Sequence, residues 1–266
     1  MLQTLVNTMP YAQPLSSIPT EGERVALPAK LFDGLVCLAP FVKRSGDQVE
    51  KWVHLINGKF YVVTNSLILE FAFGDNALPN LMFDPDIIRT LAAFDTAPQE
   101  LVIGDNTFLF EWADGQELFM QGDAISGPVW FGGSKPMSDA RAETVDKYWS
   151  FDDGKPVDDT ARKTLRRALS APKLHKDVYL TRKGLISRMR ALKDVDGYTS
   201  EHLEPFETNA TRMMRFELQA FARMIKVATQ IDFQSSPVCF LHEGGRGLLV
   251  ERSLGSDTPD VEVWND

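Results

Sequence analysis

The chain has 266 residues, of which 44% are hydrophobic and 24% are charged, and its formal net charge is −9. This length allows one sizeable core or two smaller ones, and the composition is typical of a soluble globular protein. No apolar run approaches the roughly 18 residues that a membrane-spanning helix needs, which argues against an integral helical membrane protein.

The N-terminal residues and the cysteines indicate the compartment. Residues 1–20 have no basic start and no long apolar stretch, and we expect a pairing strand or a loose arm there, not a signal peptide. Cys37 and Cys239 lie in apolar surroundings, without a CxxC pair or a Cys/His cluster. We expect both to be reduced core residues of a cytoplasmic protein, with a disulfide as the alternative.

The first half alternates helix and strand signals. A helix is expected over 28–42, because Pro28 suits a first turn and leucines follow at helical spacing. A second helix is expected over 84–95, where Asp84 can cap the first turn. Asn57-Gly58 is typical of a hairpin turn. The strands of this half are expected at 51–56, 59–64, 67–73, 100–103, 107–112 and 117–121.

The pattern breaks from about 122 to 156, a stretch rich in glycine and proline. We predict an interdomain connector over 126–156, with a short helix over 138–148. The helix and strand signals then return. Helices are expected from 158 to 171 and over 217–231, with strands at 177–180, 185–189, 205–215, 238–242 and 247–252.

Each half therefore has the order helix, strands, helix, strands, with a period of about 130 residues. Each copy divides into two βαβββ-like parts. We predict an α+β fold of two tandem domains, with helices on one face of antiparallel sheets. The expected limits are 1–125 for the first domain, 126–156 for the connector and 157–266 for the second domain.

Positive charge is concentrated in one segment of this acidic chain. Residues 161–193 hold eleven Lys/Arg and one acid, Asp177, which gives +10. Such a segment indicates a face for polyanions, although a solvated basic surface without a partner explains the charge equally well.

Two amphipathic helices would carry this charge. On the helix that starts at 158, the outward face holds Lys163, Arg166 and Arg167. On the helix over 217–231, it holds Gln219, Arg223, Lys226 and Gln230. Rows of cations and amides suit phosphate contacts that do not depend on base sequence. The first half offers Lys30, offset by Asp33, and Arg89.

This architecture resembles the DNA sliding clamps, in particular the two-domain clamps of the proliferating-cell-nuclear-antigen type, which close as trimers. Bacterial β clamps are similar in plan but have three domains per chain. The local likenesses are the hairpin and strand of 54–65, where Asn65 stands in place of the usual Asp, and the helix of 221–229 that leads into 237–240.

The resemblance implies a processivity factor that encircles duplex DNA as a homotrimer and tethers DNA polymerase through a short peptide. It implies DNA contacts from the helix faces, without a cofactor, metal or catalytic residue. The implied DNA contacts are Lys163, Arg166, Arg167, Arg223 and Lys226, with weaker contacts from Lys30 and Arg89. The implied peptide groove has Trp130, Phe131 and Trp264 as candidates.

Two alternatives stay open. The first is a nucleic-acid-binding protein, for example a viral or phage accessory factor, that never closes a ring. The second is an enzyme, but its motifs are weak. The four histidines lack metal-ligand spacing, and residues 242–247 lack the Lys-Ser/Thr of a nucleotide loop and fit a hairpin turn better.

Overall fold

The computed structural model of the chain describes residues 22–42, 52–74, 78–104, 107–121, 125–126, 137–170, 176–181, 184–191, 198–204 and 208–255. The chain divides into two compact units. The first comprises 1–64 and 69–144, and the second comprises 65–68 and 145–266. The domain limits expected at 125 and 157 stay predictions.

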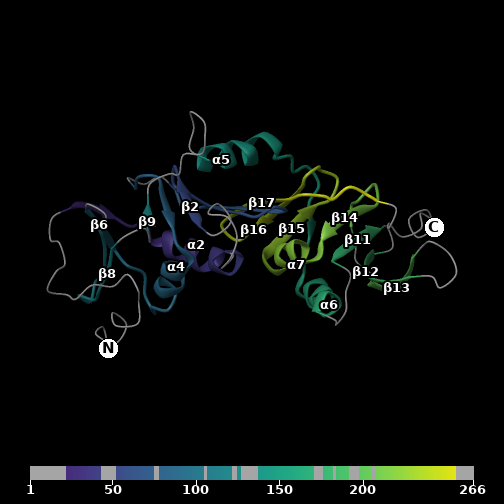
Figure 1. Cartoon of the computed structure of the whole chain (residues 1–266), viewed down its shortest axis with the longest axis horizontal. Helices are drawn as coiled ribbons and strands as arrows, with labels where there is room; N and C mark the ends of the chain where they lie inside the picture. Colours follow the sequence, from purple (N-terminus) through teal and green to yellow (C-terminus); the bar gives the residue numbers. More distant parts are fainter. Residues whose placement is uncertain are drawn as a thin grey trace. The chain divides into compact units, whose positions relative to one another are not determined.

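The first unit contains two successive sets of strand, helix and three strands (Figure 1). The first set is β1 (Glu23–Ala26), α2 (Ala29–Leu38), β2 (Val53–Ile56), β3 (Lys59–Val63) and β4 (Leu67–Ala72), with a 3-10 turn, η2 (Ala39–Phe41), after α2. The first two residues of β4 belong to the second unit. The second set is β5 (Leu81–Phe83), α4 (Pro85–Leu91), β6 (Glu100–Gly104), β7 (Thr107–Glu111) and β8 (Glu117–Gln121), followed by β9 (Ile125–Ser126).

The second unit repeats this order after helix α5 (Met137–Tyr148). Its first set is β10 (Lys155–Pro156), α6 (Asp159–Ser170), β11 (Asp177–Thr181), β12 (Gly184–Ala191) and β13 (Tyr198–Glu204). Its second set is β14 (Met214–Glu217), α7 (Leu218–Val227), β15 (Ala228–Asp232), β16 (Val238–His242) and β17 (Gly245–Leu249). The expected βαβββ repeat is therefore confirmed.

The two sets within each unit exchange their first strands. In the first unit, β1 pairs with β6 of the other set, and β5 pairs with β2. In the second unit, β10 pairs with β15, and β14 pairs with β11. All these pairs are antiparallel. Within the first unit, neighbouring strands follow the orders β1-β6-β7-β8 and β4-β3-β2-β5-β9, and within the second unit they follow β10-β15-β16-β17 and β13-β12-β11-β14. This exchange gives each unit an internal two-fold pattern that helical or strand periodicity cannot reveal.

Local sequence signals explain where several elements begin and end. Asn57 and Gly58 both have positive φ, 47° and 77°, as the tight turn between β2 and β3 requires. The Asp84 side chain accepts a hydrogen bond from the Asp86 N–H at 2.8 Å and so caps α4. The segment 242–247 forms the β16–β17 hairpin with Gly244 at φ 88°, as expected, and not a phosphate loop.

Each unit has its own aromatic core under its helices. In the first unit, Phe60 packs against Phe73 and Phe83, with ring centroids 4.9 and 5.8 Å apart. In the second, Phe221 of α7 lies between Phe216 and Phe233, with centroids 5.4 and 6.5 Å away. Phe221 is fully buried, so the predicted inward face of this helix is correct.

Three expected elements differ from the structure. The last helix ends at Val227, not at 231, because residues from Ala228 onward pair as β15 with β10 and β16. The expected strand at 205–215 is wrong in position, since β13 ends at Glu204 and β14 begins at Met214. Helix α4 ends at Leu91, and Phe94 beyond it stacks on Trp112 with ring centroids 4.3 Å apart.

Both cysteines are free thiols, and burial raises the pKa of the Cys239 thiol. Within the described residues, no helix is long and apolar enough to cross a membrane.

Candidate nucleic-acid interface

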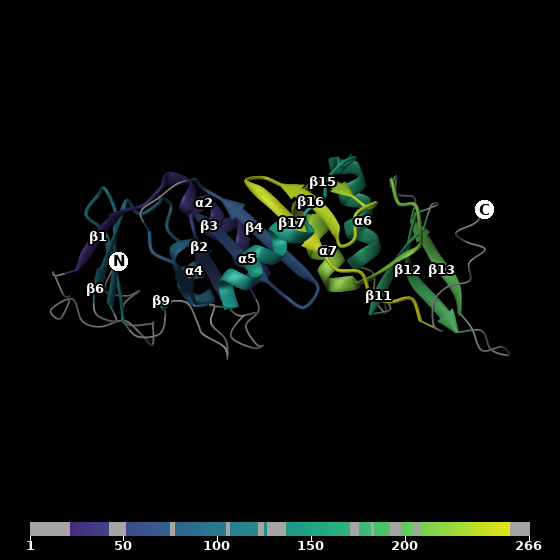
Figure 2. The ribbon, with the colours of Figure 1, turned by 90° about the horizontal axis from the view of Figure 1, so that it is seen from above.

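Helices α6 and α7 lie side by side in the second unit, as both views agree (Figures 1 and 2). On α6, Leu165 is buried, whereas Lys163 and Arg166 are exposed. Arg167 belongs to the same helix. An apolar stripe holds the helix on its unit and leaves the cations outside, as the amphipathic pattern predicts.

The exposed side of α7 continues the polar surface. Gln219 and Lys226 are exposed, and Arg223 is half-buried. Gln230 does not belong to this row, because it lies in β15, although it is exposed there. The expected interface on α7 therefore consists of Gln219, Arg223 and Lys226.

Arg162 of α6 has a different role from its basic neighbours. Its Nη2 donates hydrogen bonds to the carbonyl oxygens of Ala228, at 2.9 Å, and Val157, at 3.3 Å. Ala228 is the C-cap of α7, where a cation is favoured by the helix dipole. Arg162 therefore joins the first turn of α6 to the end of α7 and is not available to a phosphate.

Asp177, the single acid of the basic segment 161–193, has its charge neutralised by two arginines. It is buried, and its carboxylate accepts hydrogen bonds from Arg215, at 2.6 and 2.9 Å, and from Arg252, at 2.7 Å. Arg252 also pairs with Glu217 at 3.2 Å. This buried acid therefore does not offset the exposed cations of α6 and α7.

The helices of the first unit differ in charge. Lys30 and Asp33 are both exposed on α2. On α4, the Arg89 Nη1 lies 2.6 Å from an Asp86 carboxylate oxygen. Within their helical bounds, α2 and α4 together hold two cations against two acids, whereas α6 and α7 hold six against one. The sequence analysis identified Lys30 and Arg89 as candidates but missed the ion pair between Arg89 and Asp86. A spacing of three residues on a helix favours such a pair.

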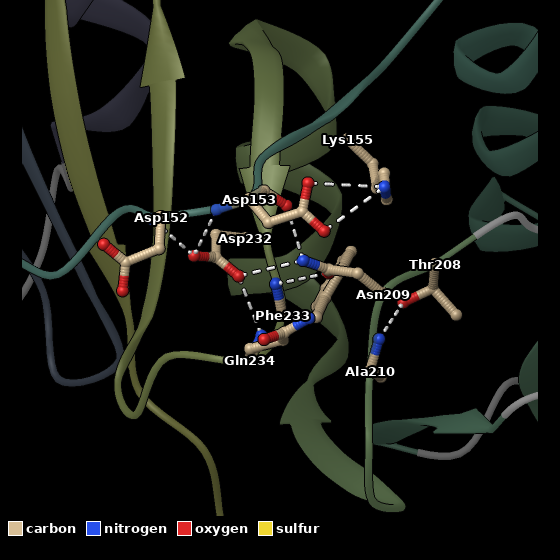
Figure 3. A network of polar contacts seen from close by, with 9 residues as sticks. All are labelled: Asp152, Asp153, Lys155, Thr208, Asn209, Ala210, Asp232, Phe233 and Gln234. Atoms are coloured by element: carbon tan, nitrogen blue, oxygen red, sulfur yellow. Dashed lines mark hydrogen bonds and ion pairs between the residues drawn. The ribbon is translucent and has the colours of Figure 1, made fainter.

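The end of the expected connector is anchored by Asp232 (Figure 3). Its Oδ2 accepts hydrogen bonds from the N–H groups of Asp152, at 3.0 Å, and Asp153, at 3.4 Å. Its Oδ1 accepts from the side-chain amide of Asn209, at 3.0 Å, and from the N–H of Gln234, at 2.9 Å. The carboxylate thus joins three segments of the second unit, and its four donors mark it as a structural group.

Asn209 completes this network from the segment between β13 and β14. Its Nδ2 also donates to the Asp153 carbonyl at 2.6 Å, and its Oδ1 accepts from the Phe233 N–H at 2.9 Å. The sequence gives little sign of this anchor, because its four donors come from three separate segments.

The expected peptide-groove residues Trp130, Phe131 and Trp264 lie outside the described residues. Among the residues that are described, no cluster of three or more His, Cys, Asp or Glu side chains could hold a metal ion.

The comparisons with known proteins bear on the fold. No family model matches the sequence, and no curated protein sequence matches it. Solved structures do match. The DNA polymerase III β chain of Streptococcus pneumoniae is 12% identical with a TM-score of 0.59, over 91% of this chain and 67% of that one. The Bacillus subtilis DNA polymerase sliding clamp is 12% identical with a TM-score of 0.56, over 91% and 69%.

The Helicobacter pylori β clamp bound to a DNA ligase peptide is 9% identical, with a TM-score of 0.54, over 91% of this chain and 70% of that one. Identities this low concern the fold and not the activity. Together with the exchanged βαβββ sets, these matches lead to one conclusion: the chain has the fold of the DNA sliding clamps.

Proposed function

We propose that this chain is a non-enzymatic, sliding-clamp-like processivity factor of the cytoplasm, which closes as a homotrimer around duplex DNA and tethers a DNA polymerase. The observation that carries the proposal is the pair of basic helix faces on α6 and α7 within a clamp fold. A closed ring holds DNA by topology, so each phosphate contact can be weak and still allow sliding.

The DNA contacts are Lys163, Arg166, Arg167, Arg223 and Lys226, with lesser roles for Lys30 and Arg89. In support, Lys163, Arg166 and Lys226 are exposed and make no ion pair within the described part of the chain. These side chains are free to contact phosphates without first breaking an internal bond.

Ring closure requires complementary strand edges, one from each unit, in a head-to-tail contact. In the first unit, β8 ends its sheet, and in the second unit β13 ends its sheet. The opposite edge strand of the sheet that contains β13 is β14. It is partly covered, because the Arg252 N–H donates to the Arg215 carbonyl at 2.8 Å. We propose that β8 of one chain pairs with β13 of the next.

Polymerase would dock through a short peptide, for which Trp130, Phe131 and Trp264 remain the candidates. Support comes from the similar Helicobacter pylori clamp, which was solved with a DNA ligase peptide. A direct test is binding of a short fluorescent polymerase peptide to the wild-type chain and to a Trp264→Ala variant. Equal binding by both would remove Trp264 from the site.

The DNA contacts are tested with a variant that replaces Arg166, Arg167, Arg223 and Lys226 by Ala. We expect weaker binding to duplex DNA and a flatter dependence of affinity on salt, because each lost phosphate contact lowers the slope by about 0.9. Circular dichroism would verify folding. Unchanged affinity in a folded variant would contradict the assignment of these helix faces.

The ring itself is tested by topology. Protein assembled on nicked circular DNA should resist high salt and should be released when a restriction enzyme linearises the circle. Equal retention on circular and linear DNA would favour the alternative, a nucleic-acid-binding or phage accessory protein that does not close a ring.

A further inference from the structure

The cation of α4, Arg89, is half-buried and has an acid beside it. Arg89 Nη1 lies 2.6 Å from Asp86 Oδ1, one helical turn away, and the side chains are 35% and 77% exposed. A phosphate that approaches Arg89 therefore also meets the Asp86 carboxylate, which is closer to solvent. To bind the phosphate, Arg89 must leave an existing ion pair, so little net attraction remains.

Helix α2 has the same arrangement of charge. Lys30 and Asp33 are exposed and three residues apart, a spacing that brings side chains together on one helix face. Val36, three residues further, is 42% exposed and adds no charge. The outer face of α2 is therefore neutral over its length.

The two helices of the second unit carry fewer counter-charges. The one acid within α6, Asp159, lies in its first turn, three residues before Arg162 and four before Lys163. Arg166 and Arg167 have no acid within one turn on α6. Helix α7 has no acid within its bounds. Arg223 and Lys226 thus have no acidic neighbour on their own helix.

From this contrast we infer that Asp33 and Asp86 neutralise the helices of the first unit, so that the second unit supplies nearly all of the electrostatic attraction for duplex DNA. The inference rests on the proposed function and refines it. In a ring, helix pairs that attract DNA would alternate with neutral helix pairs around the duplex. Sliding would then involve fewer simultaneous phosphate contacts than if both units of each chain were basic.

Three double variants of the full-length chain test this inference, with duplex DNA affinity measured by fluorescence anisotropy between about 50 and 200 mM salt. Lys163→Ala/Arg166→Ala removes two cations from α6. Lys30→Ala/Arg89→Ala removes two from the first unit. Asp33→Asn/Asp86→Asn removes the two counter-charges. Thermal unfolding would establish that each variant is folded.

Two phosphate contacts account for roughly a tenfold change in affinity over this salt range. Between the lowest and the highest salt, the affinity of the α6 variant for DNA should fall about tenfold less than that of the wild-type chain. The affinity of the Lys30/Arg89 variant should fall almost as much as that of the wild-type chain. The Asp33/Asp86 variant should bind DNA more tightly at low salt. Over the same salt range, its affinity should fall up to about tenfold more than that of the wild-type chain. Glu23→Gln/Glu243→Gln is the matched control, because it removes two exposed acids that lie outside the helices.

The outcomes separate this inference from the proposed function. If the Lys30/Arg89 variant loses as much salt dependence as the α6 variant, or if the Asp33/Asp86 variant behaves like its control, the inference is overturned while DNA binding stands. If no variant changes DNA affinity, the DNA-binding function itself is contradicted.

Discussion

Replacing Asp232 should release the anchor that holds the end of the connector on the second unit. The carboxylate is 2% exposed and accepts four hydrogen bonds from N–H groups. Hydrogen bonds to charged groups contribute about 1.5–3 kcal/mol each. Here four donors share one carboxylate, and water replaces part of the bonding after truncation. We therefore expect Asp232→Ala to cost about 3 kcal/mol in free energy of unfolding.

Asp232→Asn should be nearly as destabilising, although its shape is the same. Each carboxylate oxygen faces two N–H donors, so in either orientation the new amide NH₂ points at two donors. The matched control is Asp152→Asn, which alters an exposed carboxylate whose neighbour is Ser150, at 3.5 Å. Its backbone N–H still donates to Asp232.

The assay is thermal unfolding followed by circular dichroism. A loss of about 3 kcal/mol corresponds to a decrease in Tm of roughly 11 °C for a unit of this size. The Asp152→Asn control should unfold within about 2 °C of the wild-type chain. If Asp232→Asn unfolds at the same temperature as this control, the network does not anchor the connector and the reasoning is refuted.

The stability lost in the Asp232→Asn variant should depend on pH. Burial alone raises the pKa of the Asp232 carboxyl, but its N–H donors outweigh burial and hold that pKa below its usual range. A depressed folded-state pKa gives stability that is present above the unfolded value, about 3.9, and is lost as pH falls through the folded value. The stability difference between wild type and Asp232→Asn should therefore be constant near pH 7 and shrink below about pH 4.

Three further substitutions probe the packing. Phe221→Ala should cost about 3–5 kcal/mol in urea unfolding, because the ring is fully buried; a near-neutral result would mean that α7 faces the other way. Gly34→Ala, normally favourable in a helix, should cost about 1–3 kcal/mol, because the added Cβ would lie 2.8 Å from Phe71; a stabilised variant would contradict this packing. Arg162→Met should lower Tm without flattening the salt dependence of DNA binding, since its guanidinium faces carbonyl groups; a flatter slope would make it a DNA contact.

The fold was predictable where local chemistry decides it. Asn57-Gly58 specifies its own turn, Asp84 caps α4, and the leucines of α2 are buried as their spacing predicts. The βαβββ repeat followed from the order of these signals. Strand exchange within each unit was not predictable, since periodicity shows which face is buried but not which strand lies beside it.

Tertiary pairing explains the errors. The apolar spacing of α7 continues through Ala228, and no glycine or proline marks the helix end, so pairing of β15 with its neighbours overrides the helical pattern. Strand β13 has polar residues at most positions and therefore carries no alternation that predicts a strand. Strand β1 has four residues with one buried, Val25, which is too short a signal.

The candidate interface was predicted in part. The exposure of Lys163, Arg166 and Lys226 follows from helical spacing, whereas the role of Arg162 depends on where the end of α7 lies. The pairing of Arg89 with Asp86 shows that a count of basic residues overstates the charge that a helix offers to DNA.

The mass of the native particle, measured by light scattering after gel filtration over a range of concentrations, tests the central claim most directly. A two-unit clamp that closes as a trimer predicts a particle of about three times 29.8 kDa. A particle that stays at 29.8 kDa at every concentration would contradict ring closure and leave a DNA-binding protein with a clamp fold.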